Sequence, residues 1–89
     1  MIYRLKFETL AEKELIEIKK SDKVSYNKAV KLLSELIEHP KTGAGNPEQL
    51  KHELSGKWSR RINKKDRLIY SIDDNEKSVK IYSFKGHYK

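Results

Sequence analysis

The chain opens with a short alternation of apolar and polar residues. Residues 2–7 read Ile-Tyr-Arg-Leu-Lys-Phe, a run rich in β-forming residues that predicts an opening strand. Thr9-Leu10-Ala11-Glu12 then fits the capping-box pattern, and apolar residues recur at helical spacing as far as Lys19-Lys20. These are Leu10, Ala11, Leu15 and Ile18. The pattern predicts a helix over residues 10–20.

A second helical stripe follows almost directly. Ser21 and Asp22 are suitable caps for it, and Pro40 ends it. Its apolar face is formed by Tyr26, Ala29, Val30, Leu33, Leu36 and Ile37. Because so few residues join the two helices, we expect an antiparallel helical hairpin that covers one face of a sheet.

The second half of the chain has the pattern of an antiparallel meander. A glycine-containing loop between Pro40 and Pro47 leads to three strand-like segments, over residues 57–63, 67–72 and 78–84, which are joined by short polar turns. The expected order is strand, helix, helix and three strands. We therefore predict one α+β domain over residues 1–89, with two antiparallel helices packed on a curved, mainly antiparallel sheet whose other face is free to bind.

Composition restricts the class of protein. The 89 residues include no cysteine, which excludes disulfides and thiolate metal sites. Charges at Arg4, Lys6 and Glu8 interrupt the start of the chain, so it does not resemble a signal peptide, and no apolar stretch is long enough to span a membrane. We expect a cytoplasmic protein that does not act on membranes.

The net charge of +7 is concentrated in one half of the chain. Residues 1–40 hold 8 Lys and Arg against 7 Asp and Glu, whereas residues 41–89 hold 12 against 6. The basic residues of the second half lie in strand-like segments and not on one amphipathic helix. A polyanion is therefore the expected partner, with nucleic acid favoured over a membrane surface.

The first segment of the predicted meander carries the densest cluster of cations. Alternation places Trp58, Arg60 and Ile62 on one of its faces and Lys57, Ser59 and Arg61 on the other, but the sequence does not fix which face binds. Two interpretations of Arg60, Arg61, Lys64 and Lys65 remain open: a solvated surface, or contacts with nucleic acid. Trp58 is expected in the core.

Recognisable catalytic motifs are missing, which narrows the possible chemistry. The sequence has no nucleophile elbow and no phosphate-binding glycine loop. His39, His52 and His87 lack metal-ligand spacing, so we expect no metal and no cofactor. Glu, His, Arg and Tyr are sufficient to cleave RNA, since RNA supplies its own nucleophile in the ribose 2′-OH.

The central block of the chain has a specific resemblance. Residues 47–62 read P-E-x-L-K-H-x-L-S-G-x-W-S-R-R-I, followed by Asp66-Arg67-Leu68-Ile69-Tyr70 and by Gly86-His87-Tyr88. This pattern resembles the Txe/YoeB family of bacterial toxins, within the RelE-like superfamily, over essentially the whole chain. The resemblance implies the fold predicted above and a ribosome-dependent endoribonuclease that cuts mRNA in the A site.

The resemblance also implies roles for individual residues. Glu48 matches the catalytic glutamate, the expected general base, and Arg67 the arginine expected to hold the scissile phosphate. His87 matches the expected general acid, and Tyr88 the tyrosine that positions or stacks on the substrate. Lys51, His52, Arg60 and Arg61 are the expected RNA or phosphate contacts. Gly86 and the extension to Lys89 depart from the family's pattern and predict a looser tail.

Partners follow from the same resemblance. It implies an acidic, YefM-like cognate antitoxin, the 70S ribosome with its mRNA, and operator DNA bound only through the antitoxin complex, while a homodimer is left open. Two alternatives to catalysis also remain. The chain as a whole can act as a basic module that binds RNA or the ribosome without cutting. Glu48, since it follows Pro47, can simply be a residue in the first turn of a helix.

Overall fold

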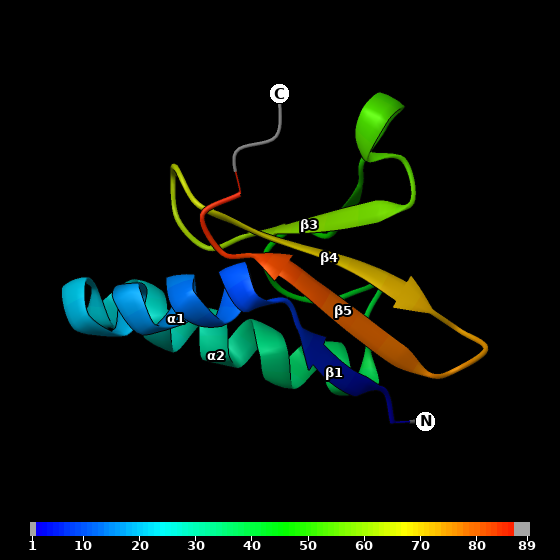
Figure 1. Ribbon diagram of the computed structural model, residues 1–89, viewed down its shortest axis with the longest axis horizontal. Coiled ribbons are helices and arrows are strands. Elements are labelled where there is room, and N and C mark those ends of the chain that lie inside the picture. Colours follow the sequence, from blue (N-terminus) through cyan, green and yellow to red (C-terminus); the bar gives the residue numbers. More distant parts are fainter. Residues whose placement is uncertain (1, 87–89) are drawn as a thin grey trace.

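The computed structural model describes residues 2–86 of the chain (Figure 1). Its elements in chain order are β1 (Arg4–Phe7), α1 (Thr9–Ser21), α2 (Lys23–Glu38), β2 (Glu48–Gln49), a 3-10 helix η1 (His52–Leu54), β3 (Lys57–Arg61), β4 (Arg67–Asp73) and β5 (Ser78–Ser83). Within residues 2–86, no helix is both long and apolar enough to cross a membrane.

The strands form a single five-stranded sheet in the order β1-β5-β4-β3-β2. β1 pairs with β5 in parallel, and every other pair in the sheet is antiparallel. The two helices lie side by side against the sheet, as Figure 1 shows. The predicted α+β class and the helical hairpin on a mainly antiparallel sheet are confirmed.

The helix caps agree with the sequence pattern at one of two places. At α2, the Asp22 carboxylate accepts the Ser25 backbone N–H at 3.0 Å and the Ser25 hydroxyl at 2.7 Å, as a capping residue should. The capping box predicted at Thr9 is wrong. The N-cap of α1 is Glu8, and no side chain bonds to the backbone there. α1 therefore begins one residue earlier than the pattern indicated.

The core lies between the helices and the sheet. The buried faces of the helices are rotated about the helix axes relative to the predicted faces. Leu10 and Val30 were expected inside but are 54% and 40% exposed, whereas Leu32 is fully buried. α2 thus turns the line through Ala29, Leu32 and Leu36 toward the sheet. Alternating strand residues complete this core, including Leu68, Tyr70, Val79 and Ile81.

β2 was not predicted. It contains two residues, and it extends the sheet beyond β3 by pairing Glu48 with Ser59 and Gln49 with Trp58. Two residues are too few for an alternation to be visible in the sequence. The short strand matters for function, because it fixes the position of Glu48 relative to β3.

Candidate active site

The cross-strand register decides which residues share the open face of the sheet. Trp58 pairs with Tyr70 and Tyr70 with Ile81, and all three pack in or against the core. Residues that alternate with these point away from the helices. The open face therefore carries two sets of neighbours: Glu48, Ser59 and Ile69 in one row, and Arg61 opposite Arg67 in the next.

Glu48 is held at the outer edge of this face by the loop that precedes it. The loop turns through Gly45 and Asn46, both with positive φ (83° and 55°), a conformation that glycine and asparagine tolerate best. Its last turn is fixed to β3, because the Gly45 carbonyl accepts the Arg61 backbone N–H at 2.6 Å. Glu48 follows directly, with its side chain exposed.

Arg60 has a different role from the one expected. Its side chain is fully buried on the core side of the sheet, so it cannot contact RNA from there, and neither sequence-based interpretation of Arg60 is correct. The guanidinium donates five hydrogen bonds, to the Tyr70 hydroxyl, the Glu35 carboxylate and the carbonyls of His39, Thr42 and Ala44. Arg60 therefore fastens the loop that carries Glu48 onto the core.

The remaining basic candidates lie around Glu48. Lys51 and His52 are exposed directly after β2, where His52 has a φ of 60° at the start of η1. Arg61 is exposed, and Arg67 opposite it is half-buried. The structure thus brings Glu48, Arg61 and Arg67 onto one face, with Lys51 and His52 at its edge. Trp58 stacks on Tyr70 against the core, as predicted.

The C-terminal candidates, His87 and Tyr88, lie outside the described residues. The chain reaches residue 86 at the site, because the Gly86 N–H donates to the Arg67 carbonyl at 3.0 Å. A Cβ at residue 86 would lie 2.5 Å from Cγ1 of Ile69 and 2.9 Å from the Arg67 carbonyl oxygen. Gly86 therefore allows a close approach to β4. The looser tail predicted from Gly86 and Lys89 concerns residues outside the described chain.

A hollow of about 310 Å³ lies beside Ile69 on the open face of the sheet. It is lined by Leu54, Ile69, Tyr82 and Gly86, together with the charged side chains of Lys57 and Glu8. The Lys57 ammonium lies 4.3 Å from the centre of the Tyr82 ring. The aromatic ring and the apolar walls suit a nucleobase, whereas the Glu8 carboxylate opposes the Lys57 charge, so the hollow is not a dedicated phosphate site.

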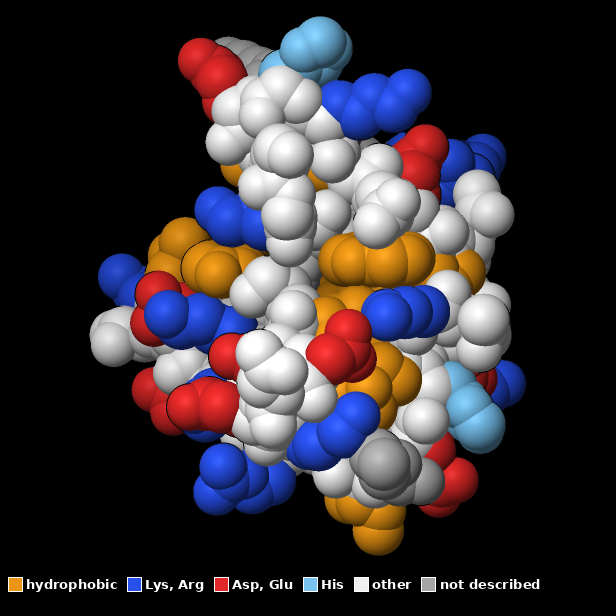
Figure 2. Space-filling model, turned by 90° about the vertical axis from the view of Figure 1, so that its right-hand side faces the viewer, with side chains coloured by type: hydrophobic (Ala, Val, Ile, Leu, Met, Phe, Trp, Pro, Cys, Tyr) orange, Lys and Arg blue, Asp and Glu red, His pale blue; other side chains and the backbone are white. Residues whose placement is uncertain are grey.

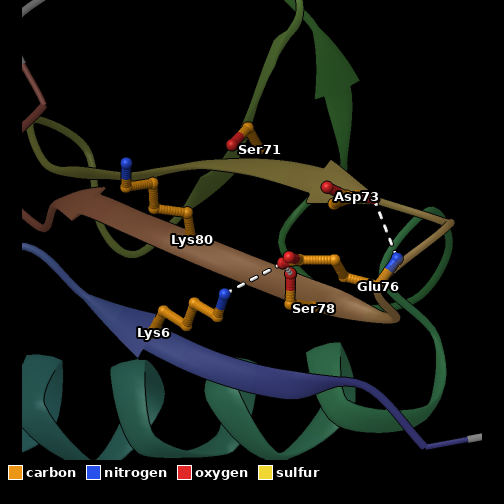
Figure 3. Close-up of a pocket in the computed structure, with 6 residues that line it drawn as sticks. All are labelled: Lys6, Ser71, Asp73, Glu76, Ser78 and Lys80. Atoms are coloured by element: carbon orange, nitrogen blue, oxygen red, sulfur yellow. Dashed lines mark hydrogen bonds and ion pairs between the residues drawn. The ribbon is translucent and has the colours of Figure 1, made fainter.

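A second hollow, of about 200 Å³, lies at the far end of the open face (Figure 3). It is lined by Lys6, Ser71, Asp73, Glu76, Ser78 and Lys80. The Lys6 ammonium is 2.9 Å from the Glu76 carboxylate, and Lys80 is 4.0 Å from Glu8. Figure 2 shows basic and acidic side chains interspersed over this end of the molecule. Its cations are compensated, so this end attracts a polyanion less than the Arg61 and Arg67 end.

Two residues of the site escaped sequence analysis, Ser59 and Gly86. Alternation placed Ser59 on the same face as Arg61, but only the sheet register shows that it lies between Glu48 and Ile69. No pattern in the sequence signals the close approach at Gly86. Within residues 2–86, no group of three or more His, Cys, Asp or Glu side chains is arranged to hold a metal ion.

Comparisons with known proteins identify the family of the chain. Residues 7–88 match the family described as the YoeB-like toxin of the bacterial type II toxin-antitoxin system. Toxin YoeB of Synechocystis is 35% identical over 97% of this chain and 98% of its own length. Toxin YoeB of Escherichia coli K12 is 46% identical over 66% of this chain and 73% of its own length.

Solved structures of YoeB toxins superpose on this chain. The YoeB dimer from Staphylococcus aureus superposes with a TM-score of 0.85 at 35% identity, covering 99% of this chain and all of that one. The toxin in the heterotetrameric YoeB-YefM complex from Staphylococcus aureus superposes with a TM-score of 0.82 at 36% identity, with the same coverage. A family match over nearly the whole chain and relatives of this similarity show that the chain belongs to the YoeB-like toxins of bacterial type II toxin-antitoxin systems.

Proposed function

We propose that this toxin is a ribosome-dependent endoribonuclease that cleaves mRNA in the A site and so inhibits translation in the cytoplasm. The observation that carries the proposal is the meeting of Glu48, Arg61 and Arg67 on the open face of the sheet. A carboxylate can take a proton, and guanidinium groups bind phosphate in its planar, bidentate geometry. Together these residues supply a general base and phosphate-binding groups, both of which RNA cleavage requires.

The proposed step uses the 2′-OH of the substrate as nucleophile. Glu48 removes the 2′-OH proton while O2′ forms a bond to the adjacent phosphorus, and the bond from phosphorus to O5′ breaks. A proton from a general acid goes to the leaving O5′. The products are a 2′,3′-cyclic phosphate and a 5′-hydroxyl end. Proton transfers and fixed cations are sufficient for this step, so the proposal includes no metal ion and no cofactor.

Roles for the basic residues follow from their places. Arg67 holds the scissile phosphate and stabilises the charge that develops on it, because it lies on the central strand one row from Glu48. Arg61, directly opposite and exposed, contacts the same phosphate or its neighbour. Lys51 and His52, at the edge beside β2, contact the RNA backbone.

The acid of the proposed step is His87, and Tyr88 positions or stacks on the substrate. What supports this assignment is the family motif Gly86-His87-Tyr88, together with the hydrogen bond from the Gly86 N–H to the Arg67 carbonyl.

The toxin's control is proposed from its relatives. The Staphylococcus aureus toxin is described in a complex with YefM and as a dimer. We propose that an acidic, YefM-like antitoxin neutralises this chain, that operator DNA is bound through that complex, and that the free toxin can form a homodimer. A net charge of +7 favours an acidic partner.

The competing proposal is a basic module that blocks the ribosome without cutting. The same cations support it, since phosphate binding alone requires no carboxylate. The position of Glu48 favours cleavage, because a carboxylate on the same face as two arginines weakens plain phosphate binding and suits a base or a positioning group.

The two proposals are separated by primer extension on mRNA programmed into 70S ribosomes. Wild type is compared with Glu48→Gln and His87→Gln, with Glu53→Gln, an exposed acid in the neighbouring η1, as the matched control. We expect discrete A-site cuts with wild type and the control, loss of cuts with the other two variants, and no cuts without ribosomes. A 2′-deoxy substitution at the cut must abolish cleavage. Stalled ribosomes carrying intact message would establish the binding module instead.

A further inference from the structure

Ser59 stands out among the buried serines of the described chain. Its side chain is fully buried, and its hydroxyl is the buried side-chain polar group within residues 2–86 that has no hydrogen-bond partner. The two other buried serines are both bonded, Ser25 to Asp22 at 2.7 Å and Ser78 to Glu76 at 3.4 Å. Burial of an unpaired hydroxyl is unfavourable, so a group held in this state needs an explanation.

The neighbours of Ser59 provide one. Ser59 is directly opposite Glu48 on one side and Ile69 on the other, and all three share the open face. Directly opposite residues of an antiparallel pair have Cβ atoms about 4.5 to 5.5 Å apart. A glutamate side chain that folds down onto the sheet therefore reaches the serine hydroxyl. In the described part of the chain, no hydrogen bond holds the Glu48 carboxylate in its exposed position.

We propose that Ser59 is a positioning residue that donates a hydrogen bond from its hydroxyl to the carboxylate of Glu48. The bond satisfies the buried hydroxyl and fixes the oxygen that faces the substrate. This inference rests on the proposed function for its catalytic consequence, although the contact itself does not. Glu48 is the suitable partner, because it is the residue directly opposite Ser59 on the neighbouring strand.

Two consequences distinguish positioning from plain packing. A hydrogen bond donated by Ser59 holds the Glu48 carboxylate in one position, so its removal changes the chemical shift of the Glu48 carboxyl carbon. It also restricts the rotamers of Glu48 without touching the RNA, so its loss slows the chemical step more than it weakens binding.

The test measures the carboxyl carbon chemical shift and the side-chain rotamer populations of Glu48 by NMR of the free toxin, in wild type and in Ser59→Ala. The matched control is Ser78→Ala, a buried serine on the same face of the sheet but at its far end. Ser59→Cys, which keeps the size of the side chain but donates only weakly, separates lost hydrogen bonding from altered packing. Thermal unfolding confirms that each variant is folded.

We expect both Ser59 variants to change the carboxyl chemical shift of Glu48 and to broaden its rotamer distribution, with no change in Ser78→Ala. On programmed ribosomes we expect Ser59→Ala to lower kcat about tenfold or more at an unchanged KM. Glu48 signals that are the same in wild type and Ser59→Ala would overturn the inference. If wild type does not cleave but the Glu48 signals still change, the contact stands and the proposed function fails.

Discussion

The guanidinium of Arg60 lies 3.0 Å from the carboxylate of Glu35, and the same carboxylate oxygen accepts the Ala44 backbone N–H at 2.8 Å. The arginine is completely buried, whereas the glutamate side chain is 27% exposed. This pair joins α2, β3 and the loop that precedes Glu48 in one hydrogen-bonded unit. The position of a catalytic candidate thus depends on an arginine that does not reach the surface.

Replacing Arg60 is expected to destabilise the whole domain. Arg60→Met leaves one carboxylate and three loop carbonyls without their donor, a loss we place at about 3 kcal/mol of the free energy of unfolding. Urea denaturation measures it. The matched control is Lys41→Met, which removes an exposed ion pair with Asp74 at 3.2 Å and should cost less than about 1 kcal/mol. Equal losses in the two variants would contradict the proposed structural role.

Protonation of Glu35 makes the free energy of unfolding depend on pH in the acid range. The Ala44 N–H above all, and then the charge of Arg60, hold the pKa of Glu35 below its ordinary value of 4.5. The unfolded chain therefore binds this proton at a higher pH than the folded one does. The contribution of Glu35 to stability is complete above pH 4.5 and is lost as the pH falls through the folded value.

Glu35→Gln is therefore expected to reduce the slope of stability against pH below 4.5. A residual slope should remain, because the Ser25 N–H lowers the pKa of Asp22 and the Tyr3 hydroxyl lowers that of Asp74. Urea denaturation at several pH values between 3 and 6 measures the slope in both proteins. An identical slope in wild type and Glu35→Gln would show that this carboxylate does not contribute.

Gly86→Ala should disturb the site without unfolding the domain. The added Cβ meets the Ile69 side chain and the Arg67 carbonyl at distances that require the chain to shift. We expect cleavage on programmed ribosomes to fall about tenfold or more, because residue 86 can no longer keep its hydrogen bond to Arg67 and its close approach to β4. Gly56→Ala is the matched control, since a Cβ there meets no atom within 4 Å, although its φ of 93° costs some stability.

Arg61→Ala should separate activity from stability. Its side chain is exposed, so the free energy of unfolding should change by less than about 0.5 kcal/mol. Loss of one phosphate contact should weaken ribosome binding and reduce the slope of log affinity against log salt by about one unit. Lys64→Ala, an exposed cation in the turn after β3, is the control. An unchanged salt dependence in Arg61→Ala would remove this residue from the RNA-contacting set.

The sequence by itself determined the class of fold and the order of its elements apart from β2 and η1. Local signals were sufficient for this: alternation in residues 2–7, helical spacing before Pro40, and the short turns between the last three strands. Asp22 was correctly identified as a cap, since capping depends on neighbours three residues away. The family motif identified Glu48 and Arg67 as candidate site residues. The register of the sheet placed them on one face.

Only the tertiary structure decided what each of these side chains contacts. Arg60 and Arg61 are adjacent and chemically identical, yet Arg60 is buried with five hydrogen bonds and Arg61 is exposed, because successive residues of a strand point to opposite faces. The sequence did not show what Ser59 and Gly86 contact. Their importance arises from residues on neighbouring strands, and strand pairing is a non-local interaction that no local pattern encodes.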